Sequence, residues 1–179
     1  MRPVRLFASL LTATVVLVAP ASGSAPRTPP PPAEAELRAL GHLPERAPIA
    51  TQRIYFVVTD RYANGDTAND RGGLRGSRGL TGFDPTDPAW FHGGDLRGLT
   101  GGCTDHRKGL VRVKDLGFTS VWITPPFRQR FVQGSSAAYH GYWPLDLMTV
   151  DPHLGTERDF GTFVACAHRL GLKIYLDVV

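Results

Sequence analysis

Ile54-Tyr55-Phe56-Val57-Val58 is an uninterrupted run of apolar and β-branched side chains, which predicts a β-strand covered on both faces. Two similar runs follow at residues 119–124 and 173–179. Apolar residues at helical spacing lie between the runs, at residues 106–116 and 156–170. Strands that alternate with single helices are joined by right-handed crossovers, so the sequence predicts an α/β fold with a parallel sheet.

Both predicted helices carry recognisable end signals. Gly117 follows the first helix, where a C-terminal cap is expected. Thr156 and Asp159 form a capping-box pattern at the start of the second helix, and Gly171 follows its end. A further short helix is expected at residues 33–40.

The N-terminus has the pattern of a secretory signal peptide. Arg2 and Arg5 precede an apolar run over residues 6–18, and Ala19-Pro20-Ala21 resembles a cleavage site. The alternative, an uncleaved membrane anchor, is disfavoured because the run is short for a bilayer. We therefore expect a signal peptide at 1–25, a Pro-rich linker and N-terminal segment at 26–52, and a secreted, extracellular domain from 53 to 179 with no membrane contact after cleavage.

Charge and motifs exclude two classes of partner. The chain carries 20 Lys and Arg against 16 Asp and Glu, and the basic residues are scattered. The one Gly/Arg stretch, residues 73–79, lacks the interleaved aromatic side chains of a nucleic-acid-binding tract. No Gly-x-Gly-x-x-Gly follows the first predicted strand, and there is no phosphate-binding loop. We expect neither nucleic acid nor nucleotide to bind.

Cys103 and Cys166 are the two cysteines of the chain. In an oxidising compartment they are candidates for a disulfide, although Cys166 lies in a predicted helix, where a buried thiol is equally plausible. No set of His or Cys partners surrounds them, so they do not indicate a zinc site. The sequence leaves the pairing open.

The loops after the first two predicted strands are long, and long loops are more often functional than structural. In the first, residues 64–70 read Asn-Gly-Asp-Thr-Ala-Asn-Asp. Such oxygen-bearing side chains suit calcium, which takes about six to eight oxygen ligands, but the spacing is not that of an EF-hand. An Asx-rich turn would have the same composition.

The second loop contains an aromatic cluster, Ala-Tyr-His-Gly-Tyr-Trp at residues 138–143. Aromatic rings with polar tips suit the C–H faces and hydroxyl edges of sugars in a concave site. The same six residues could also serve only to pack the loop. The residues alone do not decide between these two interpretations.

Taken together and in order, these segments resemble the α-amylase family, glycoside hydrolase family 13. The resemblance is carried by residues 54–70, 92–98, 116–125, 138–143, 155–160 and 176–179. It is closest to the subgroup of cyclodextrin glucanotransferases and related bacterial α-amylases. It implies a (β/α)8 TIM barrel, of which this chain holds the first three strands and two helices as an N-terminal part.

The resemblance also implies a structural calcium ion (Ca2+) that joins the two parts of the first loop. The implied ligands are Asn64, Asp66, Asn69, Asp70, Gly93 through its carbonyl, and Asp95. An ion held by segments distant in sequence would offset the entropy of ordering a long loop.

For the second loop, the resemblance implies contact with the glucose whose bond is broken. Tyr142 would stack on the sugar ring, His140 would hydrogen-bond a hydroxyl, and Trp143 would continue the wall of the site. The partner would be an α-glucan such as starch or maltodextrin, bound by a protein that is monomeric at full length.

The family's catalytic carboxylates, a nucleophile and an acid/base, would all follow Val179, and the resemblance makes Asp60 and Asp177 structural supports. We therefore expect a retaining glycosidase that cleaves α-1,4-glucosidic bonds, with the present chain inactive alone. The alternatives are an α-glucan transglycosylase similar to cyclodextrin glucanotransferase and a non-catalytic glucan-binding member of the fold.

Overall fold

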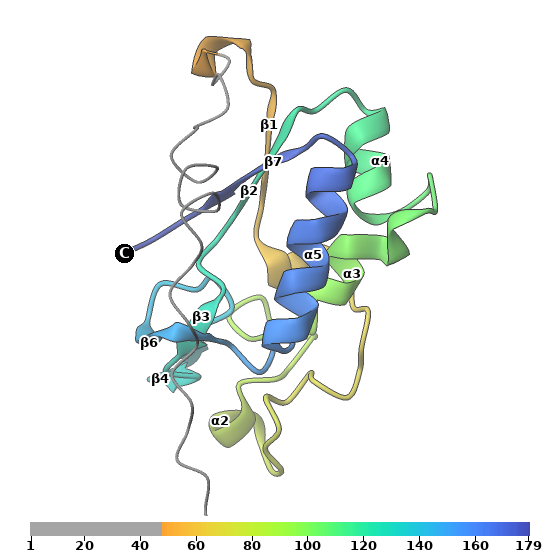
Figure 1. Ribbon diagram of the computed structural model, residues 1–179. Helices are drawn as coiled ribbons and strands as arrows, with labels where there is room; N and C mark the ends of the chain where they lie inside the picture. The colour runs from red at the N-terminus through yellow and green to blue at the C-terminus, as the bar shows by residue number, and fades with distance from the viewer. Residues whose placement is uncertain (1–47) are drawn as a thin grey trace, which may run out of the picture. The chain divides into compact units, whose positions relative to one another are not determined.

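The computed structural model describes residues 48–179 (Figure 1). The expected signal peptide, most of the linker and the expected helix at 33–40 lie outside the described residues. Strands β1 (Ile54–Val57), β2 (Ser120–Ile123) and β7 (Lys173–Leu176) form a parallel sheet in the order β1-β2-β7. The three predicted strands and their parallel arrangement are confirmed, and each strand ends one to three residues earlier than predicted.

Three helices lie together on one side of this sheet (Figure 1). They are α3 (Leu96–Thr100), α4 (Gly109–Asp115) and α5 (Glu157–Arg169). The core between helices and sheet is apolar. Its fully buried members include Leu96, Leu99, Leu110, Val121, Ile123, Phe163 and Ala167.

Helix α5 begins and ends as the sequence predicts. The Thr156 hydroxyl accepts from the Asp159 amide at 3.3 Å, and the Asp159 carboxylate accepts from the Thr156 amide at 2.9 Å. Two backbone N–H donors at the helix start are thereby satisfied, which is the function of a capping box. The capping-box prediction is confirmed.

Helix α4 begins three residues later than predicted, at Gly109 instead of residue 106. Gly109 has a φ of +60°, and a Cβ atom there would lie 2.4 Å from the carbonyl oxygen of Thr100. The chain therefore passes close to the end of α3 in a left-handed conformation that glycine adopts readily. The helix cannot extend back through this position.

The second face of the sheet is exposed, whereas the sequence predicts a first strand covered on both faces. Phe56 and Trp122 lie side by side on it, with ring centroids 5.6 Å apart, and their exposed fractions are 53% and 39%. Within residues 48–179, helices cover one face of the sheet and leave this one open. The prediction of a first strand covered on both faces is therefore wrong for the described part of the chain.

The loops that follow β1 and β2 contain small elements of their own. The first loop includes the 3-10 turn η2 (Thr59–Arg61) and helix α2 (Arg78–Thr81). The second loop pairs β3 (Phe127–Gln129) with β6 (Pro144–Val150) and β4 (Val132–Gln133) with β5 (Ser136–Ala137), both antiparallel. Two further 3-10 turns are η1 (Ile49–Thr51) and η3 (Gly101–Cys103).

Cys103 and Cys166 form a disulfide that joins η3 to the buried face of α5. The sequence left open whether Cys166 is a buried free thiol or is paired with Cys103, and in the structure the two are paired. In the part of the chain that the structure describes, no helix has the length and apolar character needed to cross a membrane.

Candidate functional site

The aromatic cluster at residues 138–143 is attached to the carboxyl end of β2. Gly141 has a φ of +84°, and a Cβ atom added there would lie 2.3 Å from the carbonyl oxygen of Pro125. Only a residue without a side chain allows this close approach. Glycine therefore lets the cluster lie directly against the chain that leaves β2.

His140 is at the centre of the cluster. Its ring stacks on Tyr142 with centroids 5.6 Å apart and planes inclined by 20°, and it meets the Trp143 ring edge-on at 4.8 Å. Tyr139 approaches it from another side at 5.1 Å. The three predicted substrate-binding residues, His140, Tyr142 and Trp143, are thus brought together.

A hydrogen bond to the His140 ring indicates which nitrogen carries its proton. Its Nδ1 accepts from the backbone N–H of Tyr142 at 2.9 Å, so the proton of the neutral ring is on Nε2. Burial lowers the pKa of His140, which favours this neutral form. The ring therefore has an Nε2–H donor that suits a sugar hydroxyl.

Tyr142 connects the cluster to the third strand. Its hydroxyl donates to Oδ2 of Asp177 at 2.5 Å, just beyond the end of β7, and this bond is the main cause of the raised pKa of Tyr142. The Tyr142 side chain remains 40% exposed. Asp177 thus orients the aromatic ring, as expected of a structural support.

Asp60 has the corresponding role at the end of β1. Its buried carboxylate accepts from the amides of His92 and Gly93 at 2.9 and 3.0 Å and lies 3.1 Å from Nε of Arg61. Burial raises its pKa, and the hydrogen bonds and Arg61 oppose this shift. Asp60 therefore holds the segment that starts at His92 against the first strand.

The six predicted calcium ligands fall into two neighbouring groups. Asn64 Nδ2 donates to Asp70 Oδ1 at 2.6 Å, and a Cβ atom on Gly93 would lie 2.6 Å from both of these atoms. Asp95 is fully buried and accepts from Asn69 Nδ2 at 3.2 Å and from the Asp66 amide at 2.8 Å. The structure therefore brings segments 64–70 and 93–95 together.

Two observations on this structure fit a cation. Oδ1 of Asn69 is buried and has no hydrogen-bond partner, which is costly for a polar atom. The pKa of Asp70 is raised by burial, with further increases from Asp95 and Asp66, while its bond from Asn64 lowers it. A hard cation would satisfy the amide oxygen and stabilise the charged carboxylate.

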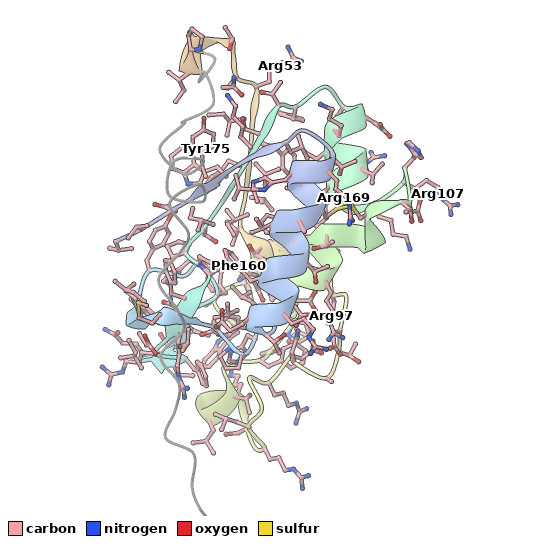
Figure 2. All side chains as sticks on the ribbon, in the orientation of Figure 1. Arg53, Arg97, Arg107, Phe160, Arg169 and Tyr175 are labelled. Carbon is pink, nitrogen blue, oxygen red and sulfur yellow. A yellow bond between two sulfur atoms is a disulfide. The ribbon has the colours of Figure 1, made fainter. Side chains whose placement is uncertain are left out.

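Asp66 is the exception among the predicted ligands. Its Oδ2 accepts a hydrogen bond from Nη1 of Arg97 at 2.6 Å. The Nε atom of Arg97 also donates to Asp159 of α5 at 2.7 Å. Figure 2 shows the Arg97 side chain near the start of this helix. Across residues 48–179, no three His, Cys, Asp or Glu side chains already converge on a metal position. The candidate oxygen set thus depends on amides and a backbone carbonyl as well as on carboxylates.

Sequence reasoning missed the buried polar residues behind the aromatic cluster. Gln129, Asp151 and His153 are all less than 4% exposed. Their bonds join positions up to 72 residues apart, and no spacing in the sequence reports them. The Asp-x-His pattern at 151–153 was the one local signal.

Comparison with known proteins identifies the chain's relatives. The model of the alpha amylase catalytic domain matches residues 56–179. An alpha-amylase of Streptomyces lividans is 37% identical over 98% of this chain, and a periplasmic alpha-amylase of Escherichia coli is 39% identical over 70% of it. The chain spans 18% of the length of each of these two relatives.

Solved structures of amylase-type enzymes are also similar to this chain. CldA, a cyclomaltodextrin glucanotransferase, is 36% identical with a TM-score of 0.59 over 71% of this chain and 25% of its own. An alpha-amylase from Geobacillus thermoleovorans, solved with acarbose, is 36% identical with a TM-score of 0.52 over 70% of this chain and 22% of its own. The parallel strands and crossovers described above are thus part of an amylase-type (β/α)8 barrel, and the chain belongs to the alpha-amylase family.

Proposed function

We propose that the full-length protein is a secreted, retaining glycosidase that cleaves α-1,4-glucosidic bonds in starch or maltodextrins. The observation that carries this proposal is the aromatic wall of His140 and Tyr142, which lies beyond the carboxyl end of β2. In a (β/α)8 barrel, the loops at the carboxyl ends of the strands build the active site. The relatives' activities and the acarbose complex of one of them support the choice of an α-glucan.

Each residue of the wall has a defined part in this proposal. The half-exposed ring of Tyr142 offers an apolar face to the sugar, and its bond to Asp177 fixes the ring's direction. His140 donates from Nε2 to a sugar hydroxyl while its Nδ1 is occupied by the Tyr142 amide. Trp143 closes the wall beside His140. The proposal assigns bond cleavage to no residue of the present chain.

We further propose that calcium has a structural role in the first loop. Asn64, Asn69, Asp70, Asp95 and the Gly93 carbonyl would hold the ion, which would supply positive charge between two segments that converge there. Asp66 joins this set only if its carboxylate leaves Arg97. No part of the sugar chemistry is assigned to the ion.

A second activity, transglycosylation with cyclic products, is favoured by the likeness to CldA. The test is to incubate the purified full-length protein with maltoheptaose and to separate the products by chromatography. Short linear maltooligosaccharides support the hydrolase, and cyclodextrins support the transglycosylase. A protein that binds maltoheptaose without converting it would contradict both activities and leave the non-catalytic glucan-binding alternative.

A further inference from the structure

A buried polar cluster lies behind the aromatic wall, and the proposed function makes no use of it. Gln129, Asp151 and His153 are 3%, 0% and 1% exposed. Polar side chains are costly to bury unless hydrogen bonds satisfy them. The hydrogen bonds of these three side chains therefore show which parts of the backbone the cluster holds in place.

Asp151 and His153 form the base of the cluster. Oδ1 of Asp151 lies 2.9 Å from both the amide and Nδ1 of His153, and Nε2 of His153 lies 2.7 Å from the carbonyl oxygen of Thr81. The Thr81 carbonyl oxygen can only accept, so Nε2 of His153 donates to it. Asp151 and His153 therefore form a buried, hydrogen-bonded pair that is tied to the backbone at Thr81.

The His153 ring is fixed by its neighbours. It stacks on Phe91 with centroids 4.0 Å apart and planes inclined by 1°, and it meets Phe131 edge-on at 4.5 Å. A Cβ atom on Gly72 would lie 2.4 Å from its Cε1. The ring therefore has no free volume in which to turn.

Segment 129–131 connects this base to the aromatic wall. The amide of Gln129 donates to Asp151 Oδ2 at 2.8 Å, and the Gln129 side chain accepts from the Trp143 amide at 2.7 Å while donating to the Phe127 carbonyl at 2.7 Å. The Arg130 amide donates to the Trp143 carbonyl at 2.9 Å. Both polar groups of the Trp143 backbone are thus bonded to this segment.

The other end of the wall is held in the same way. The amide of Ala138 donates to the carbonyl of Phe131 at 2.9 Å, and the Phe131 ring is the one that packs on His153. Residues 138–143 are therefore hydrogen-bonded at both ends to segment 129–131. That segment in turn contacts Asp151 through the Gln129 amide and His153 through the Phe131 ring. His140 and Tyr142 lie between the two attachments.

We propose that Gln129 is a positioning residue for the sugar-contacting wall and that the Asp151–His153 pair holds Gln129 in position. The proposal rests on the proposed function, because it concerns how His140 and Tyr142 are presented to an α-glucan. Gln129 acts through the Trp143 backbone and does not contact the sugar. Displacement of a sugar-binding side chain by about 1 Å can lower a reaction rate as much as a hundredfold.

The test compares three variants of the full-length protein at a temperature well below their melting temperatures. Gln129→Met keeps the side-chain length and removes the amide, and Asp151→Asn is a milder change of the same support. Val113→Ala is the matched control, because Val113 is fully buried between α4 and the sheet, in the apolar core to which segment 129–131 does not belong. The measurements are kcat and KM on maltoheptaose and hydrogen exchange of the peptide that covers residues 138–143.

For Gln129→Met we expect kcat to fall about tenfold with KM changed by less than about twofold, because misplaced groups weaken transition-state contacts. Exchange of the 138–143 amides should become faster, with Asp151→Asn intermediate and Val113→Ala unchanged. Wild-type kcat and exchange in a folded Gln129→Met protein would overturn the proposal, as would an equal loss of kcat in Val113→Ala. If the wild-type protein does not convert maltoheptaose, the proposed function fails, and faster exchange in Gln129→Met alone supports the positioning role.

Discussion

In the proposed function, the Tyr142 side chain has two roles. Its hydroxyl is bonded to Asp177 at the end of β7, while its ring face stacks near His140 and remains partly exposed. The bond to the strand fixes the direction of the ring, and a fixed ring loses little entropy when a sugar packs against it. The two roles can be separated by substitution.

We expect Tyr142→Ala in the full-length protein to lower kcat on maltoheptaose more than it raises KM. A loss of roughly 1.4 kcal/mol of transition-state stabilisation corresponds to a tenfold lower kcat. Tyr142→Phe is the matched control, because it keeps the ring and loses only the bond to Asp177. Its kcat should lie between those of wild type and Tyr142→Ala. Full activity in both variants would remove Tyr142 from the sugar site.

His140 should titrate below its ordinary pKa of 6.5, since burial disfavours the imidazolium. As pH falls below the unfolded-state value, the unfolded chain gains a proton before the folded protein does, so folding stability decreases in acid. Protonation of Nδ1 also breaks the bond from the Tyr142 amide. NMR of labelled histidines in the full-length protein, with His140→Gln to assign the signal, measures the midpoint. A midpoint above 6.5 contradicts this account.

At the scale of elements, two loop segments far apart in sequence are joined at one place. Asp95 begins α3 by accepting from the amide of Gly98, and it also accepts from the amides of Gly65 and Asp66. Replacing Asp95 would therefore damage the loop whether or not calcium binds. Asn69 and Asp70 are better places to test the ion, since Asn69 has an unpaired buried oxygen.

We expect calcium to raise the melting temperature of the full-length protein, and Asn69→Ala or Asp70→Ala to abolish most of that increase. An ion present at 100 times its dissociation constant contributes about 2.7 kcal/mol to stability. Asp115→Ala, which removes an exposed carboxylate paired with His106, is the control and should retain the response to calcium. A melting temperature that a chelator does not change, with no metal in the protein, would exclude the ion.

The disulfide joins η3 to α5 across 63 positions of sequence. In the chain-entropy model, a loop of this length stabilises the folded state by about 4 kcal/mol. We therefore expect the double variant Cys103→Ser/Cys166→Ala to melt at a clearly lower temperature than wild type, as should the reduced wild-type protein. Adding a thiol reductant should leave the melting temperature of the double variant unchanged. Equal melting temperatures with and without the bridge would contradict this expectation.

The elements that the sequence predicted well are those with local signals. Thr156 and Asp159 are three residues apart, so the start of α5 could be predicted from a short pattern. The start of α4 could not, because it depends on the approach of Gly109 to the end of α3. The pairing of Asp66 with Arg97 was missed for the same reason, since 31 positions separate them.

At the scale of the molecule, the described residues form a three-stranded sheet with helices on one face (Figure 1). The other face carries the exposed aromatic side chains of Phe56 and Trp122. The repeat of strand and helix made the position of the helices predictable, because crossovers of one hand put successive helices on the same side. The exposed aromatic face was not predicted. The sugar-contacting role proposed for residues 138–143 was predicted only through the family resemblance. The support of these residues depends on bonds between distant positions: Gln129 to Asp151, Trp143 to Gln129, and His153 to Thr81.

We propose that His140 and Tyr142 form the wall against which an α-glucan binds, and a crystal structure of the full-length protein with acarbose would show whether they do. We expect a sugar ring packed on Tyr142 at about 4 Å, the usual contact distance between carbon atoms, with His140 Nε2 within hydrogen-bonding distance of a sugar hydroxyl. Acarbose bound elsewhere, with both side chains free of sugar, would remove His140 and Tyr142 from the glucan site.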